Sequence, residues 1–191
     1  MSTIRFEAEL FRIGSWTILR LPKSASAQLP SRGMTMVEGT INGSINGFPF
    51  QAPLEPDGKG SHWLRVDETM RAAAGADAGD TVMLEIEPAK EWTEPQVPED
   101  LKSALEADPQ AQSLWLDITT MARWDWIRWI SATAQQETRR RRIEVAFSKL
   151  KSGMRRPCCF NRSMCTEPFV SKNGVLLEPT ETTVAKARKH E

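Results

Sequence analysis

The first half of the chain alternates apolar and polar residues with the period of β-strands. Residues 4–10, IRFEAEL, place an apolar side chain at every second position, which predicts a strand with one buried face. Residues 16–21 form a second run that is largely apolar. Gly14-Ser15 lies between the two runs and predicts a turn, so we expect a hairpin.

Further strand and turn signals follow up to residue 87. Residues 34–41 and 48–51 flank two Asn-Gly pairs, and this dipeptide favours the positive φ angles of a type I′ turn. Asp67 is placed to cap a short helix that ends at Ala74. The remaining strands are expected at residues 62–66 and 81–87. Six or so short strands with tight turns indicate a closed or half-closed barrel.

The pattern changes to helices after a linker at residues 94–98, EPQVP. Pro98 suits the first turn of a helix through Ala107, which Asp108-Pro109 ends. A last helix is expected to begin near Thr133, because Thr133 and Gln136 match a capping box. Its apolar residues share one face, and Gly153 ends it; they are Ile143, Ala146, Phe147 and Leu150.

These patterns predict a mainly β plus α chain, in which a small β-barrel precedes a C-terminal helical segment. The expected parts are a barrel domain over residues 1–95, a helical module over 96–153 and an irregular, basic tail over 154–191 that contains the cysteines. The first residues lack a basic stretch followed by an apolar one, so no secretory signal is expected. No apolar run is long enough to span a membrane, and we expect a cytoplasmic protein.

The net charge of zero conceals an uneven distribution. Residues 1–120 carry 10 Lys and Arg against 18 Asp and Glu, whereas residues 121–191 carry 15 against 7. A basic segment of this kind can bind nucleic acid or acidic lipid. Alternatively, it packs across the acidic barrel of its own chain.

Several of these elements together resemble known families. The double Asn-Gly turn, the Asp57-Gly58 turn and residues 75–82, GADAGDTV, resemble a small bacterial and archaeal domain-of-unknown-function family with an AbrB-like double-split β-barrel. The later residues Trp129-Ile130, Glu137-Thr138-Arg139, Arg142-Ile143 and Leu150 resemble the YdeI/OmpD-associated, OmdA-like helical module, often labelled bacteriocin-protection. The resemblance covers residues 3–153 and implies the fold, whereas a fold does not determine a mechanism.

The first candidate site is a run of four arginines, Arg139, Arg140, Arg141 and Arg142, with further cations downstream. Arginines that neutralise phosphates contribute affinity for nucleic acid through counterion release. Four consecutive residues point to all sides of a helix, however, so a solvated helix face is the alternative. Arg142 is expected to lie closest to the core.

A second candidate site interleaves aromatic residues with cations between residues 123 and 129. Trp124, Trp126, Arg128 and Trp129 are candidates for binding a peptide, a small ligand or single-stranded nucleic acid, because aromatic rings provide stacking surfaces. Helical spacing places Trp126 and Trp129 on one face, and packing against the barrel is the structural alternative.

The third candidate is the cysteine cluster Cys158, Cys159 and Cys165, which follows Arg155 and Arg156. Positive charge lowers the pKa of a thiol and favours a reactive thiolate, so a thiol-based redox role is possible. Adjacent cysteines do not match the spacing of structural zinc sites. We predict neither a metal site nor a cofactor.

Catalytic motifs are missing from the sequence: it contains no phosphate-binding loop, no His-Glu-x-x-His and no local triad. Asp77 and Asp80 could be paired carboxylates, but in a Gly-rich turn such residues more often accept hydrogen bonds from backbone amides. The sequence therefore favours a non-catalytic binding or stress-protection module over an enzyme, with nucleic-acid binding and thiol redox chemistry as alternatives. It does not determine the oligomeric state.

Overall fold

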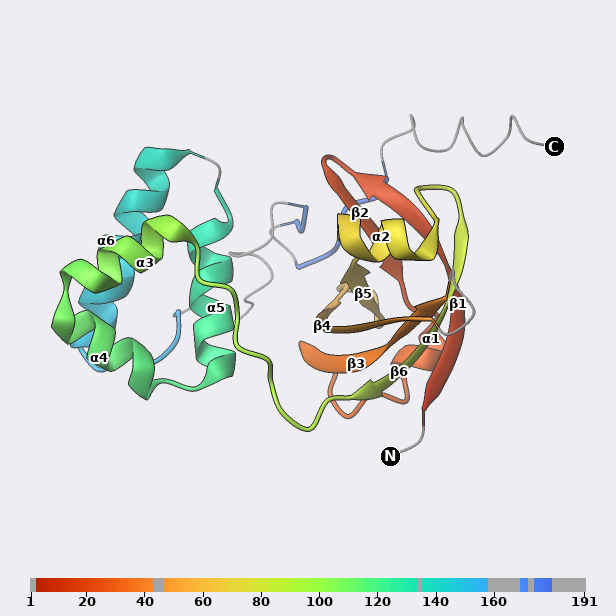
Figure 1. Ribbon diagram of the computed structural model, residues 1–191, viewed down its shortest axis with the longest axis horizontal. Coiled ribbons are helices and arrows are strands. Elements are labelled where there is room, and N and C mark those ends of the chain that lie inside the picture. Colours follow the sequence, from red (N-terminus) through yellow and green to blue (C-terminus); the bar gives the residue numbers. More distant parts are fainter. Residues whose placement is uncertain (1–2, 43–46, 134, 158–168, 172–173, 180–191) are drawn as a thin grey trace. The chain divides into compact units, whose positions relative to one another are not determined.

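The computed structural model of the chain describes residues 3–42, 47–133, 135–157, 169–171 and 174–179 (Figure 1). The chain divides into two compact units. The barrel unit comprises Met1–Glu91 together with Val175–Glu191, and the helical unit comprises Trp92–Gly174. Part of the predicted C-terminal tail is therefore grouped with the barrel.

The barrel unit contains a closed sheet of antiparallel strands in the order β1-β2-β5-β4-β3-β6. Closure through the β1–β6 pair leaves no strand with an unpaired edge along its whole length. The strands are β1 (Ile4–Ile13), β2 (Trp16–Arg20), β3 (Thr35–Asn42), β4 (Phe48–Pro56), β5 (His62–Arg65) and β6 (Thr81–Pro88).

The alternation in β1 defines the interior of the barrel, as the sequence predicts. Side chains at every second position from Ile4 to Leu10 are buried, and those between them are exposed. Leu10 pairs with Leu19, and Leu19 pairs with Leu64. Residues directly opposite each other in an antiparallel sheet point to the same face, and all three leucines belong to one hydrophobic core.

The outer face of the barrel differs from one side to the other. On β1 and β6, outward side chains such as Glu7, Glu9 and Glu87 are exposed to solvent. On β2 and β5, by contrast, the outward residues Ile18 and Trp63 are 0% and 2% exposed. The run at residues 16–21 is therefore apolar because both faces of β2 are covered, which is the usual reason for a strand that does not alternate.

Two short helices complete the barrel unit. Helix α2 (Glu68–Ala74) begins at Asp67, whose carboxylate accepts a hydrogen bond of 2.8 Å from the Met70 amide, and it ends at Gly75 with φ of 62°. Both ends agree with the sequence prediction. Helix α1 (Lys23–Ser26) lies in the connection between β2 and β3 and was not predicted.

A fully buried histidine connects α1, β5 and the loop before β3. The Nδ1 atom of His62 lies 2.8 Å from the Ser26 hydroxyl, and its Nε2 atom lies 3.0 Å from the Gly33 carbonyl oxygen. Since a carbonyl only accepts, Nε2 carries the proton in the neutral ring, and the Ser26 hydroxyl donates to Nδ1. Both side chains are 0% exposed, so they hold the fold together and are not accessible to a substrate.

The stability of the barrel unit is expected to fall when the pH drops below about 6.5. Burial lowers the pKa of His62 from its usual 6.5, although the hydrogen bond to Gly33 acts in the opposite direction. In that range the unfolded chain therefore binds more protons at this site than the folded chain, and the free energy of unfolding decreases as the pH falls.

Urea denaturation at a series of pH values between 7.5 and 5.5 measures this slope, and His62→Gln provides the comparison because it removes the titrating group. Carboxylates titrate lower, so they contribute little there. The explanation fails if the variant retains the full slope of the unmodified protein.

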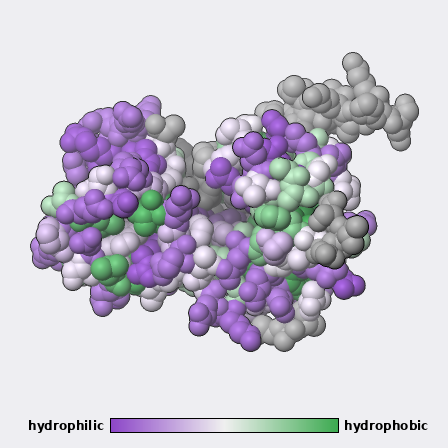
Figure 2. Space-filling model, in the orientation of Figure 1, coloured by the Kyte–Doolittle hydropathy of each residue, from purple (hydrophilic) through white to green (hydrophobic). Residues whose placement is uncertain are grey.

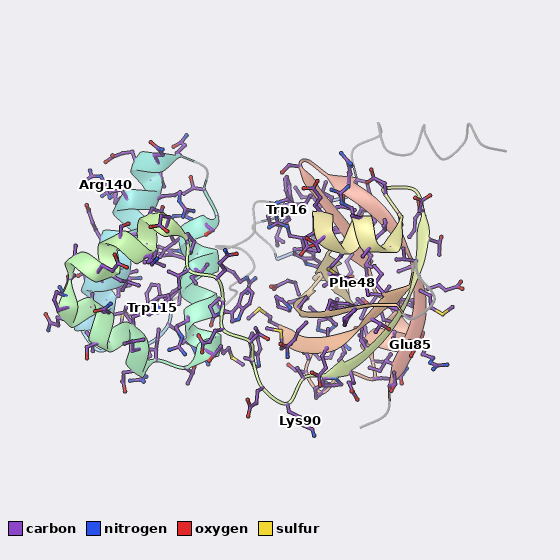
Figure 3. The ribbon with its side chains drawn as sticks, in the orientation of Figure 1. Trp16, Phe48, Glu85, Lys90, Trp115 and Arg140 are labelled. Carbon is purple, nitrogen blue, oxygen red and sulfur yellow. The ribbon has the colours of Figure 1, made fainter. Side chains whose placement is uncertain are left out.

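The described part of the helical unit contains four helices around a core of its own. They are α3 (Glu99–Ala107), α4 (Pro109–Asp117), α5 (Thr120–Ser131) and α6 (Gln136–Lys151). Trp115, labelled in Figure 3, lies in this core and is 4% exposed. Among the helices that the structure describes, none combines the length and apolar character that crossing a membrane requires.

The two ends of α6 differ in how well the sequence predicted them. The capping box at Thr133 was wrong: the helix begins at Gln136 with Gln135 as its N-cap, and no side chain caps it. The Thr133 hydroxyl instead accepts a bond of 3.3 Å from the Gln135 amide within the loop. Gly153, with φ of 87°, ends the helix as predicted. The Gly153 amide donates to the Leu150 carbonyl, and the Met154 amide donates to the Lys149 carbonyl. This pair of hydrogen bonds is a Schellman motif.

The structure thus confirms the predicted fold class, a small β-barrel followed by helices. Ile143 and Leu150 are buried as expected, whereas Phe147 is only half-buried. Whether the barrel is of the AbrB-like double-split type stays a prediction, as do the domain boundaries at residues 95 and 153.

Candidate functional site

A groove on the helical unit lies between α3 and α6 and has a volume of about 740 Å³. This volume is within the range of ligand-binding clefts. Ala104, Ile143 and Phe147 provide its apolar surface. The other lining residues are polar or charged: Glu99, Asp100, Gln136, Arg139, Arg140 and Glu144.

Helical spacing explains why α6 contributes most of the groove. The lining residues of α6 begin at Gln136 and continue at spacings of three and four up to Phe147, so they share one face. Ile143 belongs to this face and also to the core of the unit, where it is 6% exposed. Towards the N-terminal end of α6 the same face becomes charged.

Ion pairs determine which charges on the rim are available. The Arg139 guanidinium makes two hydrogen bonds, of 2.8 and 2.9 Å, to the Asp100 carboxylate and so joins α6 to α3. The hydrogen bonds from Arg139 lower the pKa of Asp100. Arg140 pairs within α6 with Glu137 at 2.7 Å and with Glu144 at 3.0 Å. The structure thus engages both rim arginines, while Glu99 on α3 is exposed.

The arginine run points around the helix, as the sequence indicated. Arg139 and Arg140 form the pairs just described, and Arg140 projects outward in Figure 3. Arg141 is exposed. Arg142 donates a 2.6 Å hydrogen bond to the Trp129 carbonyl, and its guanidinium lies 5.3 Å from the centre of the Trp129 ring. The run does not form one basic stripe, and its role in binding nucleic acid stays a prediction.

The tryptophan segment lies on α5 and contributes mainly to the core of the helical unit. Trp126 is 0% exposed, and its indole donates a 3.1 Å bond to the Arg155 carbonyl. Trp129 packs edge-on against Trp126 at 5.9 Å. Trp124 is half-buried with its indole bonded to the Thr93 carbonyl at 2.7 Å.

Arg128 is only 9% exposed. Trp126 and Arg128 are thus buried, whereas Trp124 and Trp129 each keep part of their surface exposed. Trp126 and Trp129 pack in the core of the helical unit, and the predicted ligand-binding role of the segment stays a prediction.

The predicted redox residues Cys158, Cys159 and Cys165 lie outside the described residues. The two arginines before them are described. Arg155 pairs with the Asp117 carboxylate at 2.7 Å, and Arg156 bonds to the Met121 sulfur at 3.3 Å. Over the part of the chain that the structure describes, no group of three or more His, Cys, Asp or Glu side chains is arranged to hold a metal ion.

The Asp77 and Asp80 carboxylates support a turn, as the sequence favoured. Asp80 accepts a 2.8 Å bond from the Asp77 amide, and Asp77 accepts one of 2.8 Å from the Ala78 amide. Arg12 and Arg71 both pair with Asp77 at 3.1 Å. The backbone bond and these cations lower the pKa of Asp77, so it is a poor proton acceptor.

Sequence reasoning missed the groove because α3 and α6 come together only through tertiary packing. The helical period offers one signal: it places Phe147 on the same face as the charged residues Arg140 and Glu144. Figure 2 shows mostly hydrophilic residues on the visible face of the helical unit, with a few apolar ones between them.

These features define a two-unit protein with a closed β-barrel and a grooved helical unit. Residues 6–86 match a family described as a domain of unknown function, DUF1905. Residues 94–153 match the OmdA family, described as bacteriocin-protection, YdeI or OmpD-associated. Both predicted resemblances are confirmed. A comparison with curated proteins gave no match.

Proposed function

We propose that this chain is a non-catalytic peptide-binding protein, and that its helical unit binds an amphipathic helix of the partner in the groove between α3 and α6. The observation that supports the proposal is the apolar surface of Ala104, Ile143 and Phe147 between charged rims. An amphipathic helix places its apolar side chains in such a groove and its polar side chains at the rim.

The charges around the groove favour a cationic partner. Arg139 and Arg140 are already paired with carboxylates of the same unit, so they contribute little net positive charge. Glu99 is exposed at the rim and is available to a lysine or arginine of the peptide. Complementary charge at a rim increases specificity and the rate of association.

The family description agrees with this chemistry. Residues 94–153 match a family described as bacteriocin-protection, and a cationic amphipathic helix is a common form of antimicrobial peptide. We therefore propose that the protein protects its host by binding such peptides. The two alternatives, nucleic-acid binding and thiol redox chemistry, remain proposals with less structural support.

Titration of a fluorescently labelled amphipathic peptide made only of leucine and lysine tests the groove. Ala104→Arg should weaken binding by about tenfold or more, because a long side chain would fill the apolar floor and a tenfold loss corresponds to about 1.4 kcal/mol. Ser103→Arg is the matched control: it introduces the same side chain at the neighbouring exposed position of α3, outside the groove. Circular dichroism checks that both variants fold.

The outcome also distinguishes the alternatives. Equal binding by both variants, or no binding of the peptide at all, would contradict the groove proposal. A matching peptide of leucine and glutamate should bind more weakly. Strong, salt-dependent binding of labelled single-stranded DNA would instead support the nucleic-acid alternative.

A further inference from the structure

The outer face of β2 and β5 combines buried apolar side chains with arginines. The register places Arg20 opposite Trp63 and Ile18 opposite Arg65, while Leu19 and Leu64 point to the interior. Arg20, Ile18 and Trp63 therefore share the outward face. Trp63 stacks on the half-buried Trp16 at 6.1 Å, so this face carries more buried apolar surface than the polar exterior on β1 and β6.

A segment from the C-terminal part of the chain, residues 175–179, lies against this side of the barrel unit. The Leu176 amide donates a 3.0 Å hydrogen bond to the Asp57 carbonyl at the end of β4. The Leu176 side chain is 2% exposed. The Arg20 guanidinium donates a 3.1 Å bond to the Leu177 carbonyl, so the barrel binds the backbone of the segment at two points and buries one aliphatic side chain.

Two cations of the barrel hold the carboxylate that follows. The Arg20 guanidinium lies 2.9 Å from one oxygen of Glu178, and the Lys59 ammonium lies 2.6 Å from the other. Hydrogen bonds from these two groups lower the pKa of Glu178 to about 2. A carboxylate that receives charge-assisted bonds from two partners is held more firmly than in a single surface ion pair.

Contacts within the barrel unit position both Arg20 and Lys59. The Arg20 guanidinium packs over the Phe11 ring at 5.1 Å, which restricts its orientation. Lys59 lies in the turn between β4 and β5, where the Asp57 carboxylate accepts bonds of 2.7 Å from the Lys59 amide and 2.8 Å from the Ser61 amide. None of these contacts requires the C-terminal segment, so the site is preorganised.

We propose that this outer face is a docking site for extended acidic peptides, and that residues 175–179 are its tethered occupant. The ligand class follows from the contacts: an aliphatic residue for the position of Leu176, and a carboxylate two residues later for Arg20 and Lys59. Backbone hydrogen bonds combined with one apolar anchor and one charge clamp are a common way to recognise extended segments. The site lies on the barrel unit and does not depend on the groove of the helical unit.

The covalent link of residues 175–179 to the barrel determines when a partner peptide can replace them. A linked segment has an effective concentration of up to about millimolar, so it keeps the site filled against a weak competitor. A partner peptide binds when it contacts the site more strongly or when the tethered segment is released.

The test uses the full chain and a labelled synthetic peptide with the sequence of residues 174–179, GVLLEP. The double change Leu176→Asp and Glu178→Lys should release the tethered segment without altering the barrel residues of the site. We expect this variant to bind the peptide at least about tenfold more tightly than the unmodified chain, because the tethered competitor is removed. Glu178→Lys alone should act in the same direction and replaces the double variant if that one does not fold.

Two further comparisons test whether Arg20 binds the carboxylate of the peptide. In the released variant, Arg20→Gln should weaken peptide binding by about three- to tenfold, as expected for the loss of charge-assisted bonds. Lys90→Gln is the matched control, because it removes an exposed cation of the barrel unit away from the site (Figure 3). A peptide with glutamine in place of glutamate should bind weakly to the released variant. Adding Arg20→Gln should weaken the binding of this peptide only slightly further, because the direct pair between Arg20 and the glutamate is already absent.

The proposal is overturned if the released variants bind the peptide no better than the unmodified chain does. It is equally overturned if binding is insensitive both to Arg20 and to the glutamate of the peptide. Neither result would affect the groove proposal, which has its own peptide and its own variants.

Discussion

Gly39→Ala is expected to destabilise the barrel unit by about 3 kcal/mol or more, a cost at the upper end for overpacked sites. Gly39 lies in β3 opposite Ile86 of β6. A Cβ atom at this position would lie 2.1 Å from the Glu85 carbonyl oxygen and 2.9 Å from the Ile86 Cα. Both are backbone atoms, so no side chain can rotate away, and the strands that close the barrel would have to separate.

Urea denaturation followed by circular dichroism measures this effect. Gly33→Ala is the matched control, because the nearest atom to its new Cβ would be the Ser31 hydroxyl oxygen at 3.5 Å, an ordinary contact. The control should stay within about 0.5 kcal/mol of the unmodified protein. A similar, small effect of both variants would show that β3 and β6 are not as close as the structure places them.

Leu150→Ala is expected to lower the stability of the helical unit by about 2 to 5 kcal/mol. Leu150 is 3% exposed and packs in the core with Ile143 and Trp126. Removing its side chain leaves a cavity, and the loss therefore includes packing as well as transfer from water.

Leu116→Ala gives the same substitution at a position that is 71% exposed. It should change the free energy of unfolding by no more than about 0.5 kcal/mol. Thermal unfolding of the two variants side by side makes the comparison. Equal effects would contradict the assignment of Leu150 to the core and of Leu116 to the surface.

Local patterns in the sequence predicted most of the elements. The alternation of apolar and polar residues at 4–10 is sufficient to predict β1, because the polarity of each side chain indicates which face of the strand it lies on. The cap at Asp67 and the glycines at 75 and 153 end or begin helices through contacts within a few residues. The wrong prediction at Thr133 also concerns a local motif. The two residues of the capping box are present, but the Thr133 hydroxyl accepts a hydrogen bond from the Gln135 amide in the loop before α6.

The candidate sites could not be predicted in the same way, because they depend on residues far apart in the chain. Asp100 and Arg139 meet only when α3 packs on α6. Arg20 and Glu178 are separated by most of the chain, and nothing in the local sequence of either indicates the other. Trp126 and Trp129 of α5 were prominent in the sequence because of their chemistry, but the structure packs them in the core of the helical unit.

The contacts of residues 175–179 with Arg20 and with the turn between β4 and β5 form late during synthesis on the ribosome. All six strands of the barrel are complete once β6 has emerged, but residues 175–179 are translated only after the entire helical unit. At about 5 to 20 residues per second, this interval lasts roughly 4 to 17 s.

During that interval the nascent barrel can already close, while Arg20 and Lys59 lack the Glu178 carboxylate that they later bind. Nascent chains on neighbouring ribosomes of one polysome present the same unoccupied site to each other. On the docking proposal, an extended acidic peptide would therefore meet no tethered competitor between the translation of β6 and that of Leu176.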